Sequence, residues 1–334
     1  MPDATPTSIA PPSPARRRKV WVVAQVVVTA IVLWFVGERL IEQWTAFRGS
    51  PVEVHPRWGM IALSSAIVLA TYAVLIETWR RIVISWGEEL SVRDATAVWF
   101  VSNLVRYLPW NVVFQIGAIA ELARRRRVSP ATAAGAAVLN TIVNIATGFV
   151  VAVVAGFTAL DTLSKGHATL GLVVAVLMVV GLFVLPALLP FVLGVVRRVT
   201  GRDLALGTLP RAAIYQALIG NLLAWAMYGL AFRTFVAGVM GTAAGSITAY
   251  IAIYASAYVI GYLALALPAG IGVREGVQIN ALTMLGLANV GQAGVIAVSS
   301  RLWLTILEVL PALYLLARGT RGRPPASTGD GANS

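Results

Sequence analysis

The feature that most constrains this chain is a series of apolar runs, each roughly 17–25 residues long, separated by short basic segments. A helix of that length crosses the approximately 30 Å hydrocarbon core of a bilayer. Charged residues make up 12% of the 334 residues, whereas a soluble domain has about 25%. We therefore predict an all-α polytopic integral membrane protein.

The charge and the residue types exclude several classes of function. The net charge is +12, but the basic residues flank the apolar runs, which is typical of membrane topology rather than of a nucleic-acid-binding surface. The sequence has no cysteine and only two histidines, His55 and His167, both in predicted loops. We therefore expect no nucleic-acid partner, no metal site, no cofactor and no enzymatic activity.

The basic segments predict the topology. Arg16–Lys19 and Arg318–Arg323 place both termini in the cytoplasm, which makes the chain a multi-pass protein of the cytoplasmic membrane. Tryptophans near the ends of runs, such as Trp58 and Trp303, are interpreted as interfacial anchors. Six full spans are predicted, at about 20–36, 58–76, 132–156, 168–190, 211–232 and 294–317.

The domain organisation is simple. Residues 1–15 are rich in Pro, Ser and Thr, and they predict a disordered cytoplasmic tail. Residues 319–334 predict a second such tail, and residues 16–318 form one transmembrane domain.

Two apolar segments do not fit a single crossing. The first, 95–122, contains RYLPWNVVFQ and has cytoplasmic arginines at both ends. Pro109 lacks an N–H and disfavours helix in the residue before it. We predict a re-entrant hairpin with one half-helix to about Tyr107, a bend at Leu108–Asn111 and a second half-helix that returns to the same side.

The second segment, 247–287, repeats this design around LPAGIGVREG, where Pro268 marks the break. Counting the crossings places both of its ends outside, so the two hairpins would form an inverted repeat, a pattern typical of transporters. Residues 247–267 could also form a full span followed by a short return helix, which would give eight crossings in all. The charge pattern fits both versions.

The first break carries four candidate substrate-binding residues, Arg106, Tyr107, Asn111 and Gln115. A half-helix that begins near Asn111 would direct free backbone N–H groups into the membrane, where they attract anions. Arg106 adds a permanent charge whose planar fork suits phosphate oxygens. The alternative is that Arg106 snorkels to the surface and Asn111 only caps a helix.

The second break carries Gly270, Gly272, Arg274 and Glu275. The two glycines permit a tight turn and a close approach to a ligand. Two charges at this depth favour a functional site, although an ordinary turn with a glutamate in the first turn of a helix is the alternative. Glu275 could carry a proton or pair with one of three arginines: Arg106, Arg274 or Arg301.

Polar residues also lie on the two spans that follow the hairpins. Asn140 and Asn144 share one helix face, and we favour interhelical hydrogen bonding for them over a role in a cavity. Arg301 and Glu308 share another face, and for them we keep a cavity role and a packing role equally open.

These motifs resemble those of the lysylphosphatidylglycerol synthase transmembrane region family, which is flippase-like. The resemblance rests on two groups: Tyr107, Leu108, Pro109, Gln115 and Gly117, and then Pro268, Ala269, Gly270, Gly272, Arg274 and Glu275. The chain departs from the family pattern at Trp110, where Gly is usual, and at Asn140 and Asn144, where acidic residues are common. Residues 319–334 leave no room for a lysyl-transfer domain, so the resemblance implies lipid translocation rather than aminoacylation.

The expected function is therefore that of a lipid flippase or translocase. An anionic or zwitterionic phospholipid, or a lipid-linked substrate, would place its head group in a positively charged polar cavity between the hairpins. Arg106 and Arg274 would hold its phosphate. The alternatives are a membrane scaffold or accessory subunit that partners an envelope-biosynthesis enzyme, such as a glycosyltransferase or lipid-modifying enzyme, and a small-anion transporter.

Overall fold

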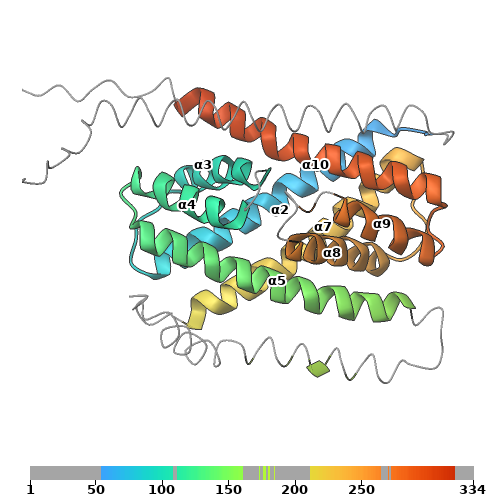
Figure 1. Ribbon diagram of the computed structural model, residues 1–334, viewed down its shortest axis with the longest axis horizontal. Helices are drawn as coiled ribbons and strands as arrows, with labels where there is room; N and C mark the ends of the chain where they lie inside the picture. Colours follow the sequence, from blue (N-terminus) through green and yellow to red (C-terminus); the bar gives the residue numbers. More distant parts are fainter. Residues whose placement is uncertain are drawn as a thin grey trace, which may run out of the picture.

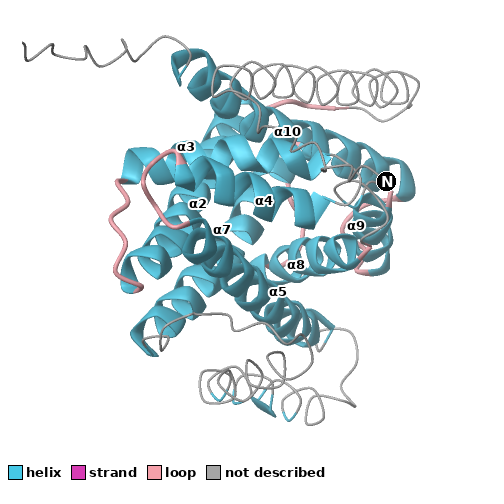
Figure 2. Ribbon diagram, turned by 60° about the vertical axis from the view of Figure 1, so that its left-hand side comes forward, coloured by secondary structure: helices cyan, strands magenta, loops and turns pink. Residues whose placement is uncertain are grey.

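The computed structural model describes residues 54–107, 111–160, 211–264, 270 and 272–319, together with five isolated helical positions, 173, 176, 177, 180 and 184. Every regular element in these ranges is helical, which confirms the predicted all-α class (Figure 1, Figure 2). The tails and the span predicted at 20–36 lie outside the described residues, as does nearly all of the span predicted at 168–190.

Four helices in the described part are long and apolar enough to cross a membrane: α2 (Trp58–Ser85), α5 (Pro130–Leu160), α7 (Arg211–Met240) and α10 (Val290–Gly319). They correspond to four of the six predicted spans, and they make the chain a multi-pass membrane protein. All four run further than predicted, and two of them extend well beyond the predicted end. The span placed at 58–76 continues to Ser85, and the span placed at 211–232 continues to Met240.

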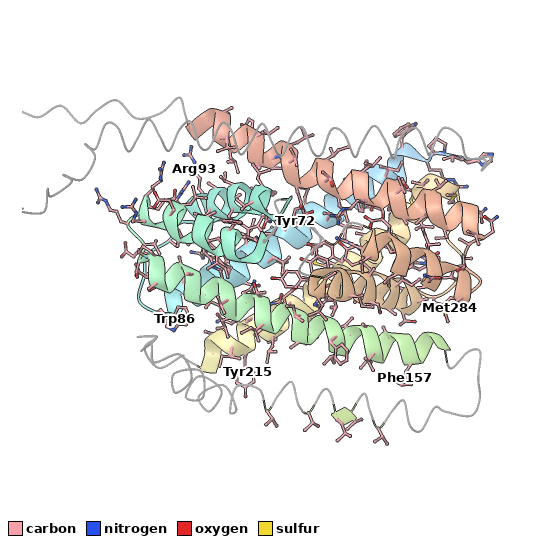
Figure 3. The ribbon with its side chains drawn as sticks, viewed as in Figure 1. Tyr72, Trp86, Arg93, Phe157, Tyr215 and Met284 are labelled. Carbon is pink, nitrogen blue, oxygen red and sulfur yellow. The ribbon has the colours of Figure 1, made fainter. Side chains whose placement is uncertain are left out.

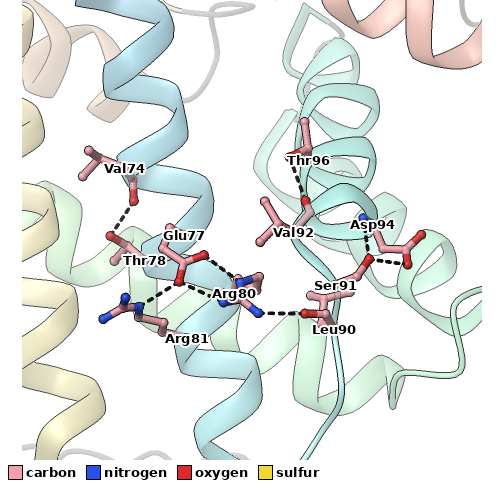
Figure 4. Close-up of polar contacts among 10 residues, drawn as sticks. All are labelled: Val74, Glu77, Thr78, Arg80, Arg81, Leu90, Ser91, Val92, Asp94 and Thr96. Carbon is pink, nitrogen blue, oxygen red and sulfur yellow. Dashed lines mark hydrogen bonds and ion pairs between the residues drawn. The ribbon is translucent and has the colours of Figure 1, made fainter.

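Ion pairs explain why α2 continues through its charged end (Figure 4). Arg80 Nε lies 2.7 Å from Glu77 Oε2, and Arg81 Nε lies 2.8 Å from Glu77 Oε1, at the three- and four-residue spacings that stabilise a helix. Arg80 Nη1 also donates to the Leu90 carbonyl oxygen at 3.0 Å, which holds the following turn against the helix. Glu77, Arg80 and Arg81 thus lie in the C-terminal part of α2 and not beyond its end.

Both predicted breaks are present. The first hairpin consists of α3 (Val92–Asn103), the 3₁₀ turn η1 (Leu104–Tyr107) and α4 (Asn111–Arg124). The second consists of α8 (Ile247–Leu263) and α9 (Val273–Met284). Pro109 and Pro268 lie outside the described residues.

The two hairpins begin in the same way. Ser91 Oγ accepts a hydrogen bond from the Asp94 N–H at 3.1 Å, and Ser246 Oγ accepts one from the Ala249 N–H at 3.3 Å. A serine in this position satisfies a backbone donor that a helix start would otherwise leave free.

The last turn of the first hairpin carries an ion pair. Arg124 donates to Glu121, and this hydrogen bond lowers the pKa of the Glu121 carboxyl.

The hairpins enter from opposite ends of the molecule. Trp86 and Arg93 mark the end at which α3 and α4 open, whereas Phe157 and Met284 mark the end at which α8 and α9 open (Figure 3). Tyr72 lies between them, near the middle of the long axis. This arrangement is the predicted inverted repeat, with α2, the first hairpin and α5 in one half and α7, the second hairpin and α10 in the other.

The halves interlock instead of packing as separate units. Helix α5 packs along α8 of the other half, and α10 packs on α3 in the same reciprocal way. Helices α2 and α7 form the most extensive contact between the halves. Each hairpin is therefore held between elements of both repeats.

Glycines set the close approach of these helices. A Cβ on Gly220 of α7 would overlap the Thr78 side chain of α2, and a Cβ on Gly229 would overlap Ile251 of α8. A Cβ on Gly148 of α5 would lie 2.6 Å from the Trp225 ring. Small residues at helix crossings allow the backbones to approach, which is the usual basis of helix packing in membranes.

Trp303 corrects one expectation. Its ring stacks on Phe235 with a centroid separation of 4.4 Å, and its indole Nε1 donates to Ser65 Oγ at 2.9 Å. It is buried between α2, α7 and α10, so it is a packing residue rather than an interfacial anchor. Trp58 is 74% exposed and fits the predicted anchor.

The Gly220 contact predicts a difference between two alanine variants. Gly220→Ala should destabilise the protein by about 1–3 kcal/mol, because the new methyl group cannot fit against Thr78. Gly156→Ala is the matched control, since a Cβ there meets no atom within 4 Å. Thermal unfolding of the detergent-solubilised variants, followed by size-exclusion chromatography, measures the difference. Equal midpoints would contradict the close α2–α7 contact.

The opposite entry of the hairpins predicts the labelling of single-cysteine variants. The chain has no cysteine of its own, so Arg93→Cys and Met284→Cys each introduce one reactive thiol. A membrane-impermeant maleimide applied to sealed vesicles of defined orientation should label one variant before lysis and the other only after it. Labelling of both from the same side would contradict the inverted arrangement.

Candidate functional site

A polar cavity of about 90 Å³ lies where the first hairpin meets α5, α7 and α8. A second cavity of about 70 Å³ shares Trp99, Gln115, Asn140 and Thr141 with it. We call the pair the amide cavity. Apart from Leu75, the lining of the larger part is polar or aromatic: Asn103, Gln115, Asn140, Thr141, Asn144, Trp99, Trp225, Tyr228, Tyr258 and Tyr262.

Side-chain amides are joined across the helices around this cavity. Asn221 of α7 accepts from Asn144 Nδ2 at 2.7 Å and donates to Asn140 Oδ1 at 3.1 Å. Asn221 Nδ2 also donates to the Ala217 carbonyl oxygen at 2.8 Å, which fixes its orientation. The interhelical hydrogen bonding predicted for Asn140 and Asn144 is confirmed, and both residues also line the cavity.

The first hairpin contributes a second amide pair. Gln115 Nε2 of α4 donates to Asn103 Oδ1 of α3 at 2.6 Å, across the break. Asn103 is 4% exposed, and its Nδ2 is buried without a hydrogen-bond partner. An unsatisfied buried donor costs roughly 1–3 kcal/mol. Asn103 therefore holds a donor available to a bound molecule.

Tyrosines of α8 connect the amide cavity to the second break. Tyr254, Tyr258 and Tyr262 recur at every fourth residue and so share one helix face. Tyr258 meets the Trp225 ring of the cavity wall at a centroid distance of 5.2 Å, and Tyr254 stacks on Tyr228 at 5.0 Å. The aromatic wall of the cavity is thus continuous with the surroundings of α9.

Arg274 lies against the same tyrosines. Its Cζ is 5.0 Å from the Tyr254 ring centroid and 5.1 Å from that of Tyr258, a geometry that stabilises a cation over a ring. The residue is 9% exposed, and its Nη2 is buried without a hydrogen-bond partner. The guanidinium is thus held by aromatic faces while one of its donors stays unused.

The glycines of the second break serve this placement. Gly270 has φ +65°, and a Cβ there would overlap the backbone of Gly261 in α8. A Cβ on Gly261 would in turn lie 3.2 Å from the Arg274 Cβ. Gly272, with φ +85°, makes the turn into α9. At Gly270 one hairpin arm therefore approaches the other closely, whereas the predicted approach of these glycines to a ligand stays a prediction.

Glu275 has two contacts. Its Oε2 accepts from the Gly272 N–H at 2.7 Å, and its Oε1 lies 3.7 Å from Arg301 Nε of α10. Arg301, one of the three arginines considered, lies at ion-pair distance from Glu275, and both side chains are only about one-tenth exposed. The side chain of Arg106 lies outside the described residues. Glu275 therefore both caps the start of α9 and pairs with a buried arginine.

Glu308 of α10 accepts a hydrogen bond from the Tyr72 hydroxyl at 3.3 Å.

The predicted site residues fall into two separate places. Gln115 lies in the amide cavity, whereas Arg274, Glu275 and Arg301 form a charged cluster on α9 and α10, beside the turn that contains Gly270 and Gly272. The backbones of Arg106 and Tyr107 lie in η1 and that of Asn111 begins α4, but their side chains lie outside the described part of the structure.

Among the described residues that line the amide cavity, none is charged. The side chain of Arg106, one expected source of positive charge, lies outside the described residues, so its part in the cavity stays a prediction. The nearest described cation on the tyrosine wall is Arg274, which contacts Tyr258 without lining the cavity itself.

In the described ranges, no group of three or more His, Asp or Glu side chains is arranged to hold a metal ion.

Sequence reasoning missed Asn103, Asn221 and the tyrosines of α8. A lone asparagine inside an otherwise apolar run is a polar group at membrane depth, and this pattern would have indicated Asn221. The four-residue spacing of Tyr250, Tyr254, Tyr258 and Tyr262 would have indicated an aromatic stripe on one face.

One family comparison covers this whole arrangement. The family model described as lysylphosphatidylglycerol synthase TM region matches residues 22–312, which include both hairpins, α2, α5 and α7, and α10 as far as residue 312. No curated relative matches the chain.

The bridging position of Asn221 predicts a large effect of its removal. Asn221→Ala should destabilise the protein by about 1–3 kcal/mol, because Asn140 and Asn144 lose their shared partner in a buried site. Asn280→Ala is the control, because Asn280 is exposed and contacts only its own helix. Detergent-based thermal unfolding compares the two, and equal midpoints would contradict the amide network.

Proposed function

Because the chain belongs to the lysylphosphatidylglycerol synthase transmembrane region family, we propose that it moves a membrane lipid from one leaflet to the other. Membership establishes a membrane domain related to lipid metabolism, and the translocase activity is our proposal. The substrate is an anionic or zwitterionic phospholipid or a lipid-linked molecule.

One observation carries the proposal: two broken hairpins enter from opposite ends of the molecule (Figure 1), and a polar cavity and the buried Arg274 lie beside them. Interrupted backbone is tolerated at membrane depth where protein buries it or where it lines a cavity. Transporters place substrate sites at such breaks, between inverted repeats. The inverted halves of this chain are built in that way.

The residues suggest how a head group is held. Arg274 keeps an unused Nη2 donor in a buried setting, where a phosphate oxygen would gain a charge-assisted hydrogen bond. Arg301 is already opposed by Glu275, so binding of an anion there would compete with the ion pair. We assign the phosphate contact to Arg274, with the acyl chains remaining in the surrounding lipid.

The interlocked halves suggest the motion. Helices α2 and α7 form the central contact, while each hairpin packs on the last long helix of the opposite half. Tilting of one hairpin against α5 or α10 would open the amide cavity first to one leaflet and then to the other. The end that carries Arg93 and Arg124–Arg127 faces the cytoplasm in this proposal, with the chain in the cytoplasmic membrane.

The function predicts the behaviour of Arg274 variants. Translocation can be measured in proteoliposomes that contain a lipid with a fluorescent acyl chain. Added dithionite destroys the fluorescence of lipid in the outer leaflet only, so the further loss of fluorescence reports lipid that has moved there from the inner leaflet. Arg274→Ala should slow it roughly tenfold or more, because a hydrogen bond to a charged group contributes about 1.5–3 kcal/mol. Arg274→Lys should retain part of the activity, since the charge remains without the planar fork.

Arg93→Ala is the control, because Arg93 is an exposed arginine at the end of the molecule. Unchanged translocation by a folded Arg274→Ala variant would reject the assignment. Uptake of phosphate or sulfate without lipid movement would indicate a small-anion transporter. Absence of any transport, together with co-purification of an envelope-biosynthesis enzyme, would indicate an accessory subunit.

A further inference from the structure

We infer that the amide cavity binds an uncharged, hydroxyl-rich group, a polyol or a sugar, at the end of the lipid head group. This inference rests on the proposed function for the identity of the cargo, but binding to the cavity can be measured separately. It assigns the neutral part of the head group to the amide cavity and leaves the phosphate to Arg274.

The first argument is the absence of charge. Among the described residues lining the cavity, neither a carboxylate nor a cation is present. An ammonium or a bare phosphate moved there from water would lose its hydration without gaining an opposite charge. A neutral polar group avoids that penalty.

The second argument is the kind of hydrogen bonding on offer. A side-chain amide presents both donors and acceptors, and so does each hydroxyl of a polyol. Asn103 contributes a buried Nδ2 with no hydrogen-bond partner, while the Oδ1 of the same amide accepts a hydrogen bond from Gln115 Nε2. Thr141 adds a hydroxyl to both parts of the cavity. A hydroxyl placed beside Asn103 would satisfy a donor that the protein leaves unpaired.

The third argument is the aromatic wall. Trp99 and Trp225 line the cavity beside Tyr258, so indole and phenol rings stand next to the amides. Pockets with aromatic walls and a few convergent polar groups suit ligands that have both apolar and polar edges. The ring of a sugar or cyclitol has C–H groups on its faces and hydroxyls around its edge.

The size agrees with one ring. The two parts measure about 90 Å³ and about 70 Å³ and have four residues in common. Together they are comparable with the ~150 Å³ cavity that admits benzene in an engineered protein. One six-membered ring, or a smaller polyol, is the group that fits.

Binding of soluble head-group analogues tests the inference directly. Saturation-transfer NMR on the purified full chain in detergent would compare myo-inositol and methyl α-glucoside with ethanolamine and methyl phosphate, all of which carry observable C–H protons. We expect signals from the two hydroxyl-rich compounds and a saturable affinity for at least one of them. Equal or stronger signals from ethanolamine or methyl phosphate would overturn the inference, as would no binding of either hydroxyl-rich compound.

Two cavity variants locate the binding. Asn103→Leu removes the unpaired donor at similar volume, and Thr141→Val removes a hydroxyl at similar shape. Each should weaken binding of the hydroxyl-rich compound roughly three- to tenfold, as expected for one lost hydrogen bond. Asn280→Leu, outside the cavity, should leave it unchanged. If Asn103→Leu does not fold, Thr141→Val alone decides, and unaltered affinity in that folded variant would overturn the inference.

Translocation separates this inference from the proposed function. Fluorescent phosphatidylinositol and a glucosyl diacylglycerol should move faster than phosphatidylethanolamine or phosphatidic acid with the same acyl chains. Movement of all four at one rate would overturn the inference and leave the translocase function standing. Movement of none, with inositol or glucoside still bound, would reject translocation while supporting the binding site.

Discussion

Broken backbone at membrane depth is the constraint on which the rest of this structure depends. A helix that stops inside the bilayer leaves N–H and C=O groups that lipid cannot satisfy. The chain stops two helices in this way, and described residues beside each break make contacts within the protein. Gly270 packs against the backbone of Gly261, and Glu275 accepts from the Gly272 N–H. In the first hairpin, Gln115 and Asn103 are paired across the break.

Charge and hydrogen-bonding capacity are kept apart in the centre of the molecule. The charged cluster of Arg274, Glu275 and Arg301 lies on α9 and α10, whereas the amide cavity is uncharged in its described lining. The rings of Tyr254 and Tyr258 lie between them and contact the guanidinium. A molecule that reaches both regions needs an anionic part and a neutral polar part, which is the composition of many lipid head groups. This separation follows from the placement of one tyrosine stripe.

The sequence predicted the elements well because their signals are local. Apolar length predicts spans, and Pro109 and Pro268 mark breaks within a few residues of themselves. The partners were harder to predict, because pairing depends on how distant helices meet. Nothing near Glu275 in the sequence distinguishes Arg301 from the other arginines. Asn221 lies 77 residues from Asn144, and Trp303 looked like an anchor until its contact with Phe235 was known. The first-hairpin predictions for Arg106, Tyr107 and Asn111 concern side chains outside the described residues.

The reciprocal packing of α5 on α8 and of α10 on α3 has a consequence for the origin of the fold. Each half covers only part of its own hairpin, so each would expose an unpaired face if it were made alone. A protein that consisted of one half would have had to form an antiparallel homodimer, with its two copies inserted into the membrane in opposite orientations. Duplication and fusion would then have fixed one orientation for each copy, leaving later substitutions to make the two hairpins chemically unlike.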